Sequence, residues 1–168
     1  MPQNEKKIEW CLRKAERELE EGNKHRGLKI IEPDLVKAKR HLEKAEHNLK
    51  AILYLEKGNF QDWCFSAGFY SIYHCFLAIL AKAGYESRNQ ECTIAVIEML
   101  IHLNEINFDQ EIVESFKSGN ENPDQKIIAL REEYQYGMEI EVAEKAKIQR
   151  IIQQSKNAVE LAKKIVFG

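Results

Sequence analysis

The sequence predicts an all-α protein: an antiparallel up-down four-helix bundle with an additional N-terminal helix and short accessory helices. Three observations support this. Apolar residues recur at helical spacing in most segments, glycine and proline are scarce, and strand-like alternation is absent, so we expect no sheet. The 168 residues suit one compact domain. We divide it into an N-terminal helix with a basic loop (1–31) and a helical bundle (32–168).

The most apolar stretch, Asp62 to Ala83, predicts the central helix. It has no charged residue between Trp63 and Ala81. A helix that is apolar on nearly every side must be buried. Its length would also suit a membrane span, but small and polar residues interrupt it and no basic cluster flanks it. We therefore expect neighbouring helices, and no membrane, around it.

The segments on either side predict amphipathic helices. Glycine closes the first, second and central helices, and acidic residues open the second, the central and one short helix, as cap preferences require. Asp62 is the expected N-cap of the central helix and Asp109 that of a short helix, and Gly137 is expected to break a late one. The expected helices are Asn4 to Glu21, Glu32 to Lys57, Asp62 to Ala83, Cys92 to Leu103, Phe108 to Lys117, Ile127 to about Ile140, and Val142 to Val166.

Charge and cysteine usage narrow the functional classes. The net charge is −2, so any contact with nucleic acid must be local. The basic loop from Lys24 to Lys29 is expected to be solvated, with a phosphate contact as the alternative.

The N-terminus lacks the apolar core of a secretory signal. The four cysteines form no CxxC pair and read as reduced core residues of a cytoplasmic protein.

No motif for a metal or cofactor is present, and we expect neither. The histidines do not form i, i+4 ligand pairs, and the paired carboxylates of a di-metal bundle are missing. His74 falls among aromatic residues of the central helix. It is interpreted as a core histidine bonded to a carbonyl or a tyrosine hydroxyl, or alternatively as a general base or phosphate ligand. Arg131, in an apolar phase of its helix, is expected to pair with Glu132 or a glutamate of another helix, with a phosphate as the alternative partner.

Three segments, in this order, resemble the HEPN-domain family of small prokaryotic helical proteins. AEHNLKAILYLEKGN, from Ala45 to Asn59, is similar to the family's amphipathic helix and glycine turn. Gly68 to His74, followed by Leu77 to Gly84, is similar to its aromatic-rich helix. Leu130 to Gly137 is similar to its late arginine-to-tyrosine motif. The resemblance covers about Leu35 to Val166.

The resemblance implies a bundle that is commonly a homodimer, and many members are encoded with a nucleotidyltransferase as a toxin–antitoxin pair. Active members are metal-independent ribonucleases in which an arginine holds the phosphate and a nearby histidine acts at the ribose. In the family, four to six residues separate this arginine from the histidine. Here no histidine follows Arg88 or Arg131 at that spacing, and only Arg40 and His47 match it formally.

We therefore predict a non-catalytic or divergent HEPN-like protein that binds nucleotide, RNA or a nucleotidyltransferase. The alternatives are a ribonuclease with a non-standard active site and a purely structural helical dimer. The candidate catalytic residues are His74, Arg88, Arg131 and Tyr136, and the candidate nucleotide- or RNA-binding residues are Arg88, Arg131 and Tyr70.

Overall fold

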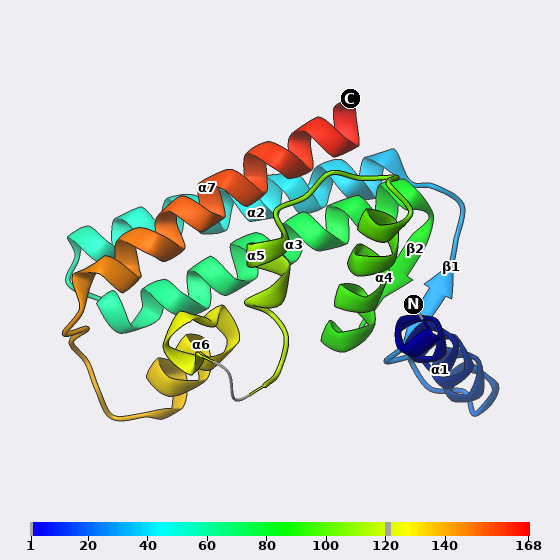
Figure 1. The fold of residues 1–168 in the computed structure, drawn as a ribbon, viewed down its shortest axis with the longest axis horizontal. Helices are drawn as coiled ribbons and strands as arrows, with labels where there is room; N and C mark the ends of the chain where they lie inside the picture. The colour runs from blue at the N-terminus through cyan, green and yellow to red at the C-terminus, as the bar shows by residue number, and fades with distance from the viewer. Residues whose placement is uncertain (1, 120–121) are drawn as a thin grey trace.

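Three long helices form the centre of the protein, described here for residues 2–119 and 122–168 from a computed structural model. They are α2 (Leu35–Lys57), α3 (Cys64–Ala83) and α7 (Lys145–Phe167), and each packs against the other two. Figure 1 shows α3 and α7 running in one direction and α2 in the other. The prediction of an all-α bundle is confirmed.

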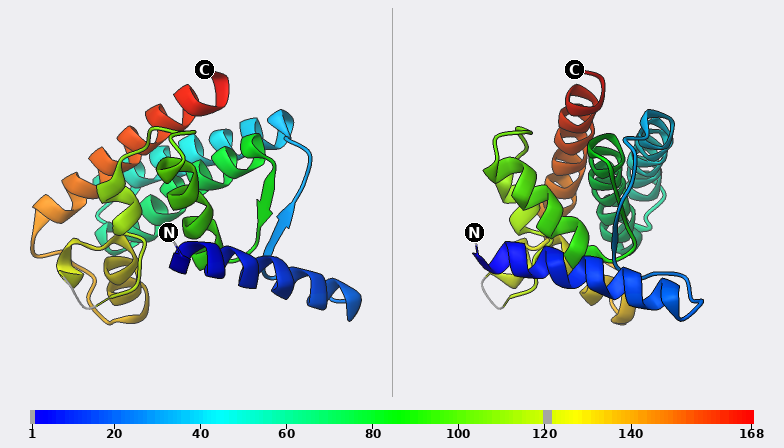
Figure 2. Two further views of the ribbon diagram at one scale, coloured as in Figure 1. Left: turned by 45° about the vertical axis from the view of Figure 1, so that its right-hand side comes forward. Right: turned by 90° about the vertical axis from the view of Figure 1, so that its right-hand side faces the viewer.

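Shorter elements cover the remaining sides of α3. They are α4 (Gln90–His102), α5 (Gln110–Glu114), α6 (Ile127–Tyr136) and the 3-10 turns η1 (Gln61–Trp63) and η2 (Pro123–Gln125). Both α4 and α6 contact α3. The N-terminal helix α1 (Pro2–Glu20) packs on α4, and Figure 2 shows it crossing one end of the molecule, away from α7.

The core is built around α3, as its uncharged sequence predicts. Phe65, Ile72 and Phe76 are fully buried. Gly68 lets α7 approach closely, because a Cβ atom there would lie 2.3 Å from Cγ1 of Ile151. Gln61–Ala83 is the one segment among the described residues that is long and apolar enough to cross a membrane. Of its most apolar 18-residue stretch, 72% is buried within the fold.

A small antiparallel sheet contradicts the expectation that no strand would form. Strand β1 (Leu28–Ile30) pairs with β2 (Tyr85–Ser87), with Leu28 opposite Ser87 and Ile30 opposite Tyr85. Each strand has three residues, too few to show a period of two in the sequence. The solvated interpretation of the basic loop is correct for Lys24 and Arg26, which are exposed, but wrong for His25 and Leu28, which are buried.

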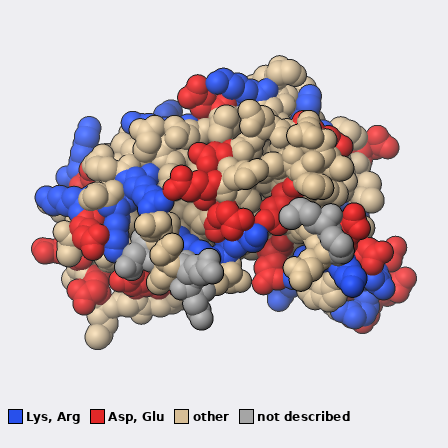
Figure 3. Space-filling view, in the orientation of Figure 1, with Lys and Arg blue, Asp and Glu red and all other residues tan. Residues whose placement is uncertain are grey.

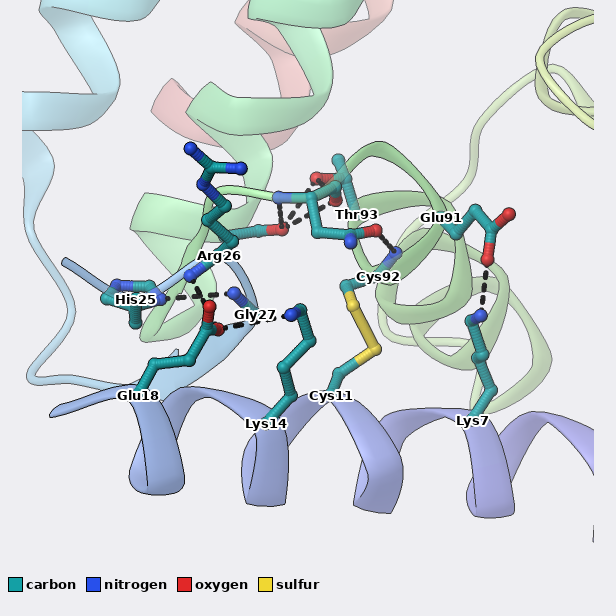
Figure 4. Close-up of a disulfide and its surroundings, with 12 residues drawn as sticks. Lys7, Cys11, Lys14, Glu18, His25, Arg26, Gly27, Glu91, Cys92 and Thr93 are labelled. Atoms are coloured by element: carbon teal, nitrogen blue, oxygen red, sulfur yellow. Dashed lines mark hydrogen bonds and ion pairs between the residues drawn. A yellow bond between two sulfur atoms is a disulfide. The ribbon is translucent and has the colours of Figure 1, made fainter. Parts of the chain in front are cut away.

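A disulfide between Cys11 and Cys92 contradicts the prediction that all four cysteines are reduced (Figure 4). The bond joins α1 to α4 across a sequence separation of 81. Cys64 and Cys75 are free and buried, as predicted. Sequence spacing did not reveal the bond because helix packing alone brings the two cysteines together.

Most predicted helix ends agree with the structure. Gly84 ends α3 in the left-handed conformation, and the Asp109 carboxylate caps α5 by accepting from the N–H groups of Glu111 and Ile112. Asp62 is not the cap that was expected, because η1 precedes α3 and the residue before α3 makes no side-chain cap. The serine, glycine, asparagine and proline residues between Ser118 and Pro123 predict a loop, and residues 120–121 of that segment lie outside the described residues.

Candidate functional site

A side-chain cap and two backbone hydrogen bonds fix the start of α2 against the end of α3. The Asp34 carboxylate accepts from the Lys37 N–H at 2.8 Å, and the Asp34 N–H donates to the Ala81 carbonyl at 2.9 Å. The Ile31 N–H donates to the Gly84 carbonyl at 2.9 Å. These bonds set the register between the two antiparallel helices, and that register places His41 of α2 opposite His74 of α3.

The two histidines form a hydrogen-bonded pair. Their Nδ1 atoms lie 3.0 Å apart, so one ring donates its Nδ1–H and the other accepts. Burial, together with the neighbouring His74, Lys37 and Arg40, lowers the pKa of His41 to about 4. Burial and the charge of Lys44 also lower the pKa of His74. The pair is therefore neutral at pH 7, with a different tautomer on each ring.

Glu86 of β2 connects the N-terminal segment to this site. Its carboxylate accepts from Nε2 of His25 at 2.8 Å and from Nζ of Lys37 at 2.5 Å, and Arg88 lies 3.7 Å away. The His25 and Lys37 hydrogen bonds lower the pKa of Glu86 to about 2. The Gly27 N–H donates to Nδ1 of His25, so the ring donates to Glu86 through the proton on Nε2.

Positive side chains and histidines follow one side of α2, with Asp34 and Glu43 among them, and two of them, Lys37 and His41, face β2. A hollow of about 260 Å³ lies between α2, α3 and β2, lined by Lys37, His41 and Arg88 among others. It adjoins an open furrow whose lining comes only from α2 and its cap, so the furrow is a helix surface and not a cleft. We use the name α2–β2 basic site for Lys37, Arg40, His41, Lys44, His47, His74 and Arg88.

Two cations of this site are not neutralised. Among the described residues, no carboxylate forms an ion pair with Arg40 or Lys44, whereas Lys37 and Arg88 both approach Glu86. Figure 3 shows acidic and basic side chains mixed over the face presented in Figure 1. Arg40 and Lys44 therefore place two positive charges without an ion-pair partner on the furrow, which the carboxylates of Asp34 and Glu43 also line.

The structure separates the residues predicted for the site into three places. His74 and Arg88 lie at the α2–β2 basic site. Tyr70, which is 43% exposed, and Arg131 both contact Phe69 on another side of α3. Tyr136, at the end of α6, is 76% exposed and lines neither the hollow nor the furrow.

The expected pairing of Arg131 with a glutamate is wrong. Its guanidinium carbon lies 4.1 Å from the centre of the Phe69 ring, and its buried Nε has no hydrogen-bond partner among the described residues. A cation above an aromatic face is stabilised by the ring quadrupole. The expected partner of His74 is also corrected, because it is another histidine and not a carbonyl or a tyrosine.

Three residues of the α2–β2 basic site were not identified from the sequence: Lys37, His41 and Lys44. Glu86, which binds Lys37, was not identified either. His41 follows Arg40, which was noted for its spacing to His47, but nothing in the sequence indicates that it faces His74, 33 residues away. His25 was assigned to a solvated loop although it is only 3% exposed. These contacts depend on the register between helices, which local periodicity does not encode.

The chemistry of the site favours anions over metals. Guanidinium and ammonium groups bind phosphate directly, and neutral imidazoles add hydrogen bonds or accept a proton. Within residues 2–119 and 122–168, no three histidine, cysteine or acidic side chains converge as a metal ion would require.

The chain was also compared with known proteins: no family model matches it, and no curated protein matches it.

Proposed function

We propose that this protein is a non-catalytic or divergent HEPN-like protein that binds the phosphates of a nucleotide or RNA at the α2–β2 basic site. The observation that carries the proposal is the pair of unneutralised cations, Arg40 and Lys44, beside His41 and Arg88 on one surface. Phosphate contacts by lysine and arginine provide affinity without sequence specificity. The HEPN resemblance supports the choice of a nucleotide or RNA over other anions.

Binding to labelled single-stranded RNA and to a labelled nucleotide tests this proposal. We expect the Arg40→Ala/Lys44→Ala variant to lose about tenfold in affinity for the ligand that binds, since each phosphate contact contributes roughly equally. For RNA, the slope of log K against log salt should fall by about 1.4, or about 0.7 for each lost contact.

A charge-matched control distinguishes a site from a general charge effect. Lys145 and Lys156 are exposed on α7, and their double substitution with alanine removes the same net charge. This control should bind within about twofold of the unmodified protein. Equal losses in the two variants, or no binding of either ligand by the unmodified protein, would contradict the proposal.

The His41–His74 pair supports one alternative function, a metal-independent ribonuclease with a non-standard site. A neutral imidazole can take a proton from the ribose hydroxyl, and the adjacent Arg88 can stabilise charge on the phosphate. On this alternative, His41→Ala or His74→Ala lowers the rate of RNA cleavage in EDTA by about 100-fold. The Tyr136→Ala variant leaves it unchanged, because Tyr136 does not line the site.

The resemblance also motivates two partner proposals, a second copy of this chain and a nucleotidyltransferase. Light scattering coupled to size exclusion measures the first, and co-purification with a tagged nucleotidyltransferase encoded beside it measures the second. A dimer that captures no such enzyme and binds no nucleotide or RNA would leave only the structural alternative, and a monomer would exclude that alternative as well. The cytoplasmic location stays a prediction, and Cys11 and Cys92 no longer support it because they form a disulfide.

A further inference from the structure

One covalent bond attaches α1 to α4. Cys11 and Cys92 have Cα atoms 5.9 Å apart, and neither residue is exposed. Figure 4 shows the bond lying between α1 and α4, with Lys7 and Glu91 on one side of it and Gly27 on the other. The chain between the two cysteines includes all of α2 and α3, so the bond joins segments that are distant in sequence.

The remaining polar contacts of α1 with α4 lie near its first two turns. The Asn4 amide donates to the Ala95 carbonyl at 2.9 Å, and Lys7 pairs with Glu91. The Glu91 side chain is 67% exposed, and an ion pair in that position is weakened by solvent and salt. These contacts orient α1, but they are easily exchanged for water.

Few large apolar side chains hold α1 in place. Its fully buried residues are the small Cys11 and Ala15. Ile8 and Leu12 are only partly buried against the core, and Trp10 and Leu19 are 47% and 44% exposed. Gly27 packs directly on this seam, since a Cβ atom there would lie 2.4 Å from the Cys11 carbonyl oxygen. Such a seam removes much less apolar area from water than the aromatic core around α3.

We propose that the Cys11–Cys92 disulfide is a redox latch for α1. In the oxidised protein the bond holds α1 against α4. Two-electron reduction releases α1 and exposes the surface of α4 that it covers, while α2, α3 and α7 stay folded because their contacts with one another do not involve α1.

A dithiol supplies the two electrons for this reduction. One thiolate of the dithiol attacks a sulfur of the disulfide, and the other cysteine leaves as a thiolate that takes up a proton. The second thiol of the reductant then resolves the mixed disulfide, releasing the second cysteine thiol and a cyclic disulfide. Because both sulfurs are buried, the attack occurs when α1 transiently lifts from α4.

The latch has a consequence for a second hollow, of about 660 Å³. Asn4 and Lys7 of α1 form one part of its lining, and Ile94 of α4, Phe116 and Ile128 form others. Release of α1 removes that part of the lining. The shape of the hollow therefore depends on the oxidation state of Cys11 and Cys92.

Hydrogen exchange of the whole protein, measured with and without dithiothreitol under native conditions, tests the proposal. Thiol alkylation after denaturation verifies the state: two free cysteines in the oxidised protein and all four after reduction. On reduction, the amides of α1 should exchange within about tenfold of an unstructured chain. The amides of α3 should remain at least about 100-fold slower than those of α1.

The Cys11→Ser/Cys92→Ser variant is the control for the reductant. It should show the exchange pattern of the reduced protein, and dithiothreitol should change it no further. Reduction of the unmodified protein provides the same comparison if this variant does not fold. The proposal is overturned if α1 stays protected after reduction, if α1 and α3 lose protection together, or if the bond fails to form or cannot be reduced without denaturant.

Discussion

The central bundle and the N-terminal segment are held together by different interactions. In the bundle of α2, α3 and α7, large apolar side chains are fully buried, and the Ser71 hydroxyl is satisfied by the Ala45 carbonyl at 2.8 Å. The N-terminal segment, α1 with β1, is attached by a disulfide, a short two-stranded sheet and the His25–Glu86 hydrogen bond. The bundle therefore depends on apolar packing. The attachment of α1 depends on the oxidation state of its disulfide, on the charge of Glu86 and on the close backbone approach at Gly27.

Truncation of a core aromatic should give the largest loss of stability and test the bundle half of this comparison. Phe76 is fully buried and contacts the rings of Phe108 and Phe116. Phe76→Ala should lower the free energy of unfolding by about 3–5 kcal/mol in urea titrations. Phe167→Ala, at a residue that is 56% exposed, should cost less than about 1 kcal/mol. Similar losses in the two variants would contradict a core centred on α3.

A methyl group at Gly27 should have a smaller and more local effect. Its Cβ would lie 2.4 Å from the Cys11 carbonyl oxygen and 2.9 Å from the Ala15 backbone nitrogen, and backbone atoms cannot rotate away. Gly27→Ala should cost about 1–3 kcal/mol, and hydrogen exchange should increase in α1 more than in α3. Gly58→Ala is the control, because its closest contact would be 3.3 Å. Equal exchange increases in α1 and α3 would show that the two regions are not separable.

Glu86 should account for the smallest effect, a pH dependence at the junction of the two regions. Its folded pKa of about 2 lies below the ordinary value of 4.5, so its carboxylate stabilises the fold fully above about pH 4.5. This stabilisation is lost as the pH falls from 4.5 toward 2. Because the side chain is 21% exposed, we expect a contribution of about 1–2 kcal/mol.

The difference in unfolding free energy between the unmodified protein and Glu86→Gln, measured from pH 2 to 7, tests this contribution. It should be largest near neutral pH and decrease in acid. A difference that does not change with pH would mean that Glu86 acts through shape and not through charge.

Much of the fold was predictable because the relevant signals are local. The uncharged run in α3 indicates burial, and Gly84 and Asp109 mark helix ends through their own backbone preferences. The site was less predictable. His74 and Arg88 were identified as single residues, but their neighbours His41 and Glu86 were not, and Arg131 and Tyr136 lie elsewhere.

By itself, the sequence determined that the chain is helical, that its aromatic helix is central, and where most helices begin and end. Only the tertiary structure decided which distant residues meet: Cys11 with Cys92, His41 with His74, and His25 with Glu86. The physical reason is that periodicity records which side of a helix is apolar, whereas contacts between polar or sulfur-containing side chains depend on how far each helix slides and rotates against its neighbour.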